Sequence, residues 1–267
     1  MRCILAGYTD KGKRKKINQD AMFLQGIETP EGQRALLAVI CDGMGGFERG
    51  EKASGEMVRL FGEWLVKEFT KLAMEEDAEE FEDALFESWE RLFQMAHQSI
   101  RLYGKLHGIK LGTTATVMLF VKERYYTAHV GDSRAYEITN RVCQLTQDQN
   151  MANMGEGSVQ YQTRNGTKKN ASSILLQGIG ASREIRPVYD SGALQRRAVY
   201  LLCSDGFRNR TDKEELFRYF SPEKLQTEKE MKENIQRIIN ILRERGERDD
   251  ATVLLIRTTD SETNLEV

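Results

Sequence analysis

The chain of 267 residues lacks long hydrophobic segments and any strong excess of one charge. No apolar run approaches the roughly 20 residues that a membrane-spanning helix needs, and residues 1–8 are too poor in apolar side chains for a signal peptide. Lys and Arg (39) nearly balance Asp and Glu (41), and a net charge of −2 predicts no general affinity for nucleic acid or an anionic membrane. We therefore expect a cytoplasmic protein that binds neither nucleic acid nor membrane.

Cysteine is scarce, with four residues in the chain, and no two of them form a Cys-x-x-Cys pair. Three of the cysteines, Cys3, Cys41 and Cys203, lie in apolar runs that are typical of strands. Buried thiols of this kind stay unpaired in a reducing compartment. We therefore expect these three side chains to be buried and free.

Hydrophobic periodicity divides the chain into strands, then two helices, then strands again. Apolar residues at three- and four-residue steps over residues 53–72 and 81–100 predict two long amphipathic helices. Short apolar runs predict strands at 3–9, 21–25, 35–41, 113–121, 124–130, 133–138, 198–203 and 251–257, and a late helix is predicted at 231–242. The three strands from 113 to 138 read as a meander with tight turns at 122–123 and 131–132. This order predicts an α+β layered domain.

One segment has no clear periodicity. Residues 147–173 are poor in large apolar side chains and rich in Gly, Asn and Gln, which is typical of a functional loop or flap. No internal repeat or linker divides the chain. We therefore expect one domain over residues 1–258, with a frayed tail at 259–267.

Acidic turns at the ends of the predicted strands are the main functional signal. Taken singly, each fits an ordinary turn in which Asp bonds its own backbone. Folding brings strand ends together, however, and clustered carboxylates repel one another unless a cation neutralises them. Oxygen ligands with little His or Cys nearby select Mg²⁺ or Mn²⁺. The turns carry Asp20, Asp42, Asp132, Asp205 and Asp249. The pattern indicates a metal-dependent enzyme that acts on phosphate.

The ordered set of motifs resembles the metal-dependent protein phosphatase 2C family (PP2C, or PPM), in its short, single-domain bacterial branch. The motifs are residues 18–21, 42–46, 112–114, 131–134, 145–148, 204–206 and 249–252. The resemblance runs from about residue 7 to about residue 257. It implies a four-layer α-β-β-α sandwich, in which two antiparallel sheets are flanked by pairs of helices.

The resemblance also implies which residues hold metal. Asp42 would bridge two ions, Mn²⁺ or Mg²⁺, and Gly43 would offer its carbonyl oxygen. Asp205 and Asp249 would complete the first metal. Asp132 would bind a third, weaker ion, on a turn that the meander places at a hairpin tip.

The implied chemistry is hydrolysis of phosphoserine and phosphothreonine on proteins. Asp20 would hold metal-bound water, and a hydroxide that bridges the two ions would attack phosphorus in line. A bacterial member would oppose a Ser/Thr kinase and share its target proteins. We expect such a protein to be a monomer.

The chain departs from the family pattern at several positions. Lys15, next to Arg14, stands where the family has a phosphate-binding Arg, and we expect both cations to bind substrate, although Lys lacks the bidentate fork. Gln19 replaces an acidic residue, Asp250 replaces Asn, and Gln149 replaces His. None of these changes removes a direct metal ligand.

Two other functions stay open. A pseudophosphatase that binds a partner without turnover is suggested by Lys15, Gln19 and Asp250. A metallo-phosphoesterase for small metabolites is the second, and residues 147–173 would discriminate, because protein substrates should depend on that flap. A P-loop is not supported, since the run at 7–13 is followed by Arg14 instead of a hydroxyl residue.

Overall fold

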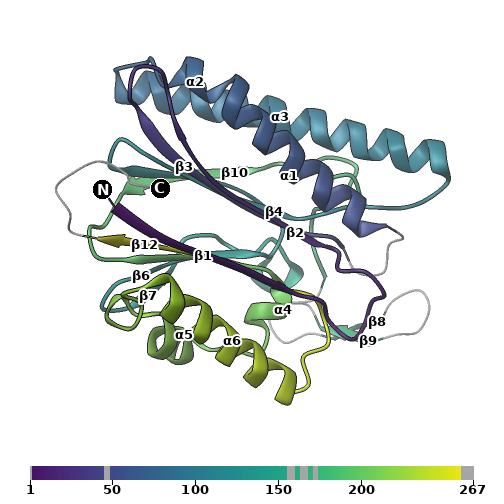
Figure 1. Cartoon of the computed structure of the whole chain (residues 1–267). Helices are drawn as coiled ribbons and strands as arrows, with labels where there is room; N and C mark the ends of the chain where they lie inside the picture. Colours follow the sequence, from purple (N-terminus) through teal and green to yellow (C-terminus); the bar gives the residue numbers. More distant parts are fainter. Residues whose placement is uncertain (1, 45–48, 155–159, 163–167, 171–173, 260–267) are drawn as a thin grey trace.

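The computed structural model describes residues 2–44, 49–154, 160–162, 168–170 and 174–259. Two five-stranded sheets lie face to face, and helices cover the outer side of each sheet (Figure 1). All neighbouring strands within the two sheets pair antiparallel. The predicted four-layer α-β-β-α sandwich is confirmed.

The two sheets are built from strands that are far apart in sequence. The first sheet has the order β10 (Val188–Ala193), β5 (Arg124–Val130), β4 (Ala115–Val121), β3 (Arg34–Asp42) and β2 (Asp20–Glu28). The second sheet has the order β1 (Arg2–Asp10), β12 (Ala251–Thr259), β11 (Val199–Cys203), β6 (Arg134–Ile138) and β7 (Val142–Gln144). A separate ladder joins β8 (Gln160–Gln162) to β9 (Lys168–Asn170).

Helices cover the outer faces of both sheets. The first sheet carries α1 (Gly50–Lys67), α2 (Phe69–Leu72) and α3 (Ala78–His107), so the predicted helix over 53–72 is divided in two. The second sheet carries α5 (Lys213–Phe220) and α6 (Glu228–Glu244). Short turns of helix complete the chain: η1 (Met151–Met154), α4 (Asp205–Arg208) and η3 (Pro222–Lys224).

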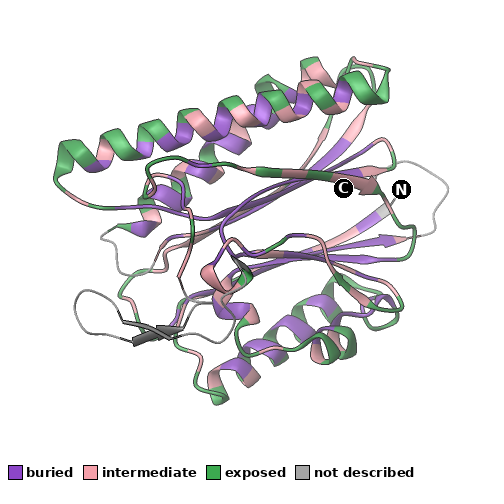
Figure 2. Cartoon of the chain, turned by 180° about the vertical axis from the view of Figure 1, so that it is seen from behind, coloured by how far each residue is buried: buried purple, intermediate pink, exposed green. Residues whose placement is uncertain are grey.

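The alternation of side chains along each strand produces three apolar layers. On β3, Leu37 and Val39 pack with the helices, whereas Leu36 and Ile40 face the other sheet. This period of two follows from strand geometry, in which successive side chains point to opposite faces. Both faces of the central strands are therefore buried, and Figure 2 shows them as continuous buried ribbons. Such a scaffold holds the strand ends in fixed positions.

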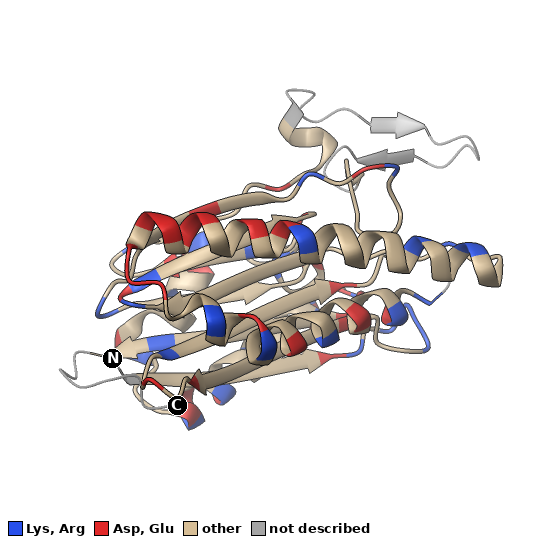
Figure 3. Cartoon of the chain, turned by 90° about the horizontal axis from the view of Figure 1, so that it is seen from above, with Lys and Arg blue, Asp and Glu red and all other residues tan. Residues whose placement is uncertain are grey.

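The long helix α3 illustrates how local sequence sets element boundaries. The Asp77 side chain accepts hydrogen bonds from the backbone N–H groups of Glu79 and Glu80, which caps the N-terminus. Gly108 ends the helix with φ of 64°. Acidic residues gather toward the start of α3 and basic residues toward its end (Figure 3), as the helix dipole favours.

Two tight turns that look alike in the sequence have different roles. The turn at Lys122 and Glu123 is the predicted two-residue hairpin, with φ of 51° and 58°. The turn at Gly131 is no hairpin, because β5 pairs with β4 and β10, whereas β6 pairs with β11 and β7. The predicted meander is wrong here: the turn carries the chain from one sheet to the other. Its Gly131 has φ of 116°, where a Cβ would lie 2.5 Å from Thr114.

Several predictions fall partly outside the described residues. These are Gly45 and Gly46 of the Gly-rich turn, positions 155–159, 163–167 and 171–173 of the proposed flap, and residues 260–267 of the tail. Cys3, Cys41 and Cys203 are buried and free, as predicted. Among the helices that the structure describes, none is both long enough and apolar enough to cross a membrane.

Candidate metal centre

The acidic turns meet at one end of the sandwich. Asp20 begins β2 directly opposite Asp42 at the end of β3. Asp205 begins α4 just after β11, and Asp249 lies two residues before β12. Asp132 lies in the corner between β5 and β6. Asp42 interacts electrostatically with Asp20, Asp205 and Asp132, and Asp205 interacts with Asp249. The structure thus brings together all five predicted acidic residues.

Burial makes this cluster costly to charge. Burial, and then repulsion from neighbouring carboxylates, raises the pKa of Asp42 well above its usual range. Burial, followed by the charge of Asp249, raises the pKa of Asp205. Burial also raises the pKa of Asp20 and that of Asp132 to about 7 each. A cation within the cluster would relieve this repulsion.

Asp20 is held by a relay of hydrogen bonds but keeps one oxygen unpaired. The side-chain amide of Asn18 donates to the hydroxyl of Thr9 at 2.7 Å. This Thr9 hydroxyl lies 2.8 Å from the hydroxyl of Thr252. Thr252 in turn donates to Oδ2 of Asp20 at 2.7 Å. Oδ1 of Asp20 is buried and has no hydrogen-bond partner among the described residues. Buried polar atoms are normally paired, so this oxygen indicates a ligand or water site.

The turn after Asp42 is fixed through its backbone. The carbonyl oxygen of Asp42 accepts two hydrogen bonds of 2.9 Å, one from the backbone N–H of Thr114 and one from the hydroxyl of Thr113. The N–H of Gly43 donates to the carbonyl of Gln19 at 3.0 Å. A Cβ on Gly43 would lie 2.4 Å from that same carbonyl oxygen, so no other residue fits. The backbone that would offer the Gly43 carbonyl is therefore held in place.

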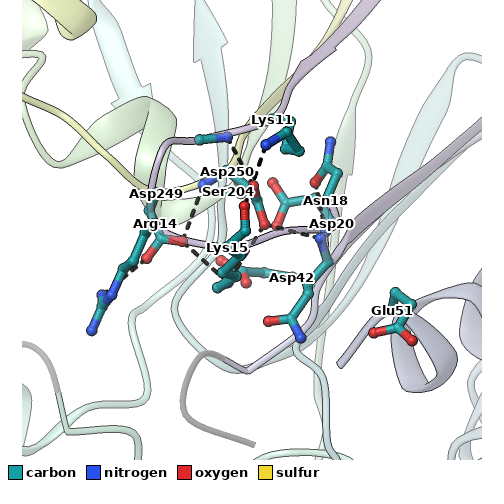
Figure 4. Close-up of polar contacts among 12 residues, drawn as sticks. Lys11, Arg14, Lys15, Asn18, Asp20, Asp42, Glu51, Ser204, Asp249 and Asp250 are labelled. Carbon is teal, nitrogen blue, oxygen red and sulfur yellow. Dashed lines mark hydrogen bonds and ion pairs between the residues drawn. The ribbon is translucent and has the colours of Figure 1, made fainter. Parts of the chain in front are cut away.

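Lys15 and Arg14 contact the cluster to different extents. The Lys15 ammonium lies 3.1 Å from Oδ1 of Asp249 and 3.5 Å from Oδ2 of Asp250 (Figure 4). Its side chain is 14% exposed, whereas that of Arg14, 3.4 Å from Asp249, is 67% exposed. Burial opposes the charge on Lys15, but the charges of Asp42, Asp249 and Asp250 outweigh burial and raise its pKa. Lys15 is the more firmly held of the two.

Asp250 has a structural role that the sequence did not reveal. Its two oxygens accept the backbone N–H groups of Gly12 and Gln19, both at 2.9 Å, and the residue is 1% exposed. A Cβ on Gly12 would lie 2.2 Å from the carbonyl oxygen of Arg248. Asp250 therefore holds the backbone on both sides of Lys15, which lies in the basic loop of residues 11–16. The pairing of a loop glycine with a distant carboxylate leaves no signal in a single sequence.

Asp132 belongs to a second acidic group that has its own arginines. Arg208 donates from Nη2 to Oδ2 of Asp132 and from Nε to its carbonyl, both at 3.0 Å. The same Nη2 lies 3.5 Å from Asp148. Arg134 holds Asp148 by two parallel hydrogen bonds of 2.7 and 2.8 Å. The sequence identified Asp132 and included Arg134 in a motif, but it did not reveal Arg208 or the pairing of either arginine, because these pairs form only in the folded chain.

The donor set fits a hard divalent cation, although its side chains do not converge on one point. Within the described residues, no three His, Cys, Asp or Glu side chains are arranged to hold one ion together. Asp249 is directed toward Lys15 and Arg14. The oxygen donors, the raised pKa values of Asp42, Asp205 and Asp20, and the unpaired oxygen of Asp20 nevertheless match the chemistry of Mg²⁺ or Mn²⁺.

Comparisons with known proteins agree on one family. The sequence model of the family described as Protein phosphatase 2C matches residues 9–253. The serine/threonine phosphatase stp of Listeria monocytogenes is 30% identical over 258 residues, which cover 93% of each chain. The serine/threonine phosphatase structure from S. agalactiae aligns with a TM-score of 0.74 at 25% identity, over 96% of this chain and 99% of that one.

A further solved structure supports the fold. It is the catalytic domain of the serine threonine protein phosphatase PstP in complex with two manganese ions. It aligns with a TM-score of 0.70 at 21% identity, over 97% of this chain and 100% of that one. Motifs, architecture and comparisons coincide over nearly the whole length, and this chain belongs to the protein phosphatase 2C family.

Proposed function

We propose that the chain hydrolyses phosphoserine and phosphothreonine on proteins with two divalent cations, Mn²⁺ or Mg²⁺. The observation that carries this proposal is the group of buried carboxylates with raised pKa values at the strand ends. The name of the Listeria relative, a serine/threonine phosphatase, supports the substrate class. The manganese ions of the PstP structure support the cofactor.

Four groups are proposed to hold the cations. Asp42 would be shared by both cations, the carbonyl of Gly43 would add a neutral oxygen, and Asp205 and Asp249 would complete the first site. When bound, two cations supply a water of lowered pKa and positive charge that neutralises the phosphoryl oxygens. The protein contributes a rigid frame, because each of these groups lies at or next to the end of a strand.

Asp20 is proposed to orient the attacking water. Its Oδ2 is occupied by the Thr252 hydroxyl, which leaves the buried Oδ1 to accept a hydrogen bond from water. With a pKa of about 7, raised chiefly by burial, this carboxyl can also hold a proton near neutral pH. Both roles need the relay from Thr9 to keep the carboxyl fixed.

Lys15 and Arg14 are proposed to bind the substrate phosphate. Both lie beside Asp249, at the edge of the candidate centre. Lys15→Ala should raise KM for a phosphopeptide about tenfold, since a charge-assisted contact is lost. Lys15→Arg should preserve or improve KM. If neither variant changes KM or kcat, the basic loop has no role in substrate binding.

We also propose a cellular location, a class of substrate proteins and an oligomeric state. Buried free thiols at Cys3, Cys41 and Cys203 support a reducing, cytoplasmic location. The substrates would be phosphoproteins shared with a Ser/Thr kinase, and the protein would act as a monomer.

One assay separates the proposed activity from its alternatives. Hydrolysis of a small aryl phosphate and of a phosphothreonine peptide is measured with Mn²⁺, with Mg²⁺ and with a chelator. We expect metal-dependent turnover of both substrates. Binding of the peptide without turnover of either would favour a pseudophosphatase. Turnover of the aryl phosphate alone, unaffected by deletion within residues 155–167, would favour an esterase for small metabolites.

A further inference from the structure

We propose that Lys15 is a built-in counter-ion that holds Asp249 until a divalent cation displaces it. The inference rests on the proposed function, because it assigns Asp249 to the metal centre. It adds a competition between a side chain of the protein and the metal, and it gives the basic loop a switching role.

The contacts of Lys15 place its charge within the candidate centre. Its ammonium lies 3.1 Å from Oδ1 of Asp249, and only 14% of its side chain is exposed. Figure 4 shows the side chain directed toward Asp249 and Asp250, with Asp42 close by. An ammonium at this distance forms a charge-assisted hydrogen bond with the carboxylate. That bond occupies one of the two carboxylate oxygens that Asp249 could offer to a metal.

The two carboxylates beside Lys15 differ in how much they need it. Asp250 accepts two backbone N–H groups, from Gly12 and Gln19, and these bonds remain when the lysine leaves. The oxygens of Asp249 accept from Lys15, from the exposed Arg14 and from the N–H of Asp250. A divalent cation would therefore compete with Lys15 for Asp249 without loosening the loop itself.

Hydrogen bonds hold the backbone of the basic loop in place and leave the side chain of Lys15 able to move. Arg14 N–H donates to the carbonyl of Arg248 at 3.0 Å, and Asp250 holds Gly12 and Gln19 on either side. The four-carbon stem of Lys15 can then swing away from Asp249. Metal binding would thus free the positive charge that substrate phosphate needs. The phosphate receptor would be complete only after the metal is present.

The amine reactivity of Lys15 tests the displacement directly. The protein is treated with an acetylating reagent at fixed pH, with and without Mn²⁺, and each lysine is quantified by peptide mass spectrometry. Lys15 acetylation should rise several-fold with Mn²⁺, because the displaced amine becomes exposed to the reagent. Lys13 and Lys16, exposed in the same loop, should not change. Unchanged or reduced reactivity of Lys15 would overturn the proposal.

Mn²⁺ affinity, measured by calorimetry without substrate, is the second test. Lys15→Gln should bind Mn²⁺ on the order of tenfold more tightly, because one competing charge is gone. The matched control Lys13→Gln removes the same charge from the same loop and should stay within about twofold, because an exposed charge is screened. Lys15→Arg keeps the charge and should stay near wild type. Equal Mn²⁺ affinities for Lys15→Gln and Lys13→Gln would overturn the proposal.

A last variant separates this inference from the proposed function. In Asp249→Asn, Lys15 should be reactive from the start, and Mn²⁺ should change its acetylation little. If wild-type protein binds Mn²⁺ but its Lys15 reactivity does not respond, the competition is refuted and the metal centre stands. If wild-type protein binds no Mn²⁺, both are refuted.

Discussion

Two groups of carboxylates lie at the same end of the sandwich, and they differ in how their charge is balanced. Asp132 and Asp148 face the guanidinium groups of Arg208 and Arg134 at distances of 2.7 to 3.5 Å. Asp42 and its neighbours instead face one another, with Lys15 at the edge. Asp132 and Asp148 form the balanced group, which is paired with arginines of the chain, although burial and the charge of Asp205 still raise the pKa of Asp132. Asp42, Asp20 and Asp205 form the unbalanced group, in which carboxylates lie near one another without an arginine partner of this kind among the described residues.

This difference in charge balance separates carboxylates with a structural role from carboxylates with a functional role. Buried charges that are paired hold a fold in one arrangement, although they add little net stability. Buried charges that repel destabilise the free protein, and persist where a ligand offsets the cost. On this reasoning we propose Asp42, Asp205 and Asp20 as ligands of cations or of water. The predictions that follow test that division, beginning with the largest effect.

Replacing a carboxylate of the unbalanced group should remove activity and leave the fold intact. Asp205→Asn should lower turnover of an aryl phosphate at saturating Mn²⁺ by at least about a thousandfold. Its melting temperature in chelator should equal or exceed that of wild type, because a buried repelled charge is gone. Mn²⁺ should then raise the melting temperature less than in wild type. Wild-type rates in this variant would show that Asp205 is no ligand.

Replacing an arginine of the balanced group should have the opposite result. Arg208→Met leaves Asp132 and part of Asp148 without a cation in a site where the side chains are about 9% and 5% exposed. The free energy of unfolding, measured with urea, should fall by about 3 kcal/mol. Exposed Arg59→Met, which breaks helix-surface pairs, should cost less than about 0.5 kcal/mol. Equal losses in both variants would remove the distinction between the two groups.

The fold was predictable where a pattern is local and strong. The apolar periodicity of residues 81–100 locates α3, and the dense apolar run at 198–203 locates β11. The edge strand β10 was missed, because only one of its faces is covered and its sequence contains Asp, Ser and Gly. The corner at Gly131 was predicted as a hairpin, since the same turn residues serve both. Which sheet a strand joins depends on pairings that lie far apart in sequence.

The candidate centre was predictable to a similar depth. Strand ends and resemblance together indicated Asp20, Asp42 and Asp205, and the structure brings them together, although their roles as ligands stay predictions. The partners of these residues could not be found in this way. Arg208 contacts Asp132 across 76 positions, and Asp250 reaches Gly12 across 238. Such contacts are products of the tertiary fold and follow no spacing in the chain.

His129 lies within the electrostatic influence of Asp148, beside the balanced group, and allows a test by pH. Its Nε2 donates to the carbonyl of Gly131 and its Nδ1 accepts from Thr116, both at 2.9 Å. Burial lowers the pKa of His129 to about 4, although the charge of Asp148 opposes this. The unfolded chain takes up a proton below about pH 6.5 and the folded chain does not. The contribution of His129 to the free energy of unfolding is therefore fully present above about pH 6.5 and is lost as the pH falls toward 4.

The size of this effect can be isolated by comparison. Between pH 7 and pH 5, wild type should lose about 2 kcal/mol of unfolding free energy through His129. His129→Gln keeps a donor for Gly131 and should lack that loss. Carboxylates with raised pKa values change stability in the opposite direction, but equally in both proteins. Parallel pH profiles for the two proteins would contradict the assignment.

Asp132 can be assigned to either of the two groups, and a variant can test which assignment is correct. The family resemblance makes it the ligand of a third, weak metal, whereas the structure pairs it with Arg208. If a metal binds there, Asp132→Ala should lower kcat about fivefold and shift the Mn²⁺ dependence to higher concentration, since a mostly hydrated site binds weakly. Both core ions should remain, as metal analysis would show. The control Asp148→Asn disturbs the same arginines and should lower stability without moving the Mn²⁺ curve. Loss of a core ion in Asp132→Ala would place Asp132 in the unbalanced group. An unchanged Mn²⁺ curve would leave it as the partner of Arg208 alone.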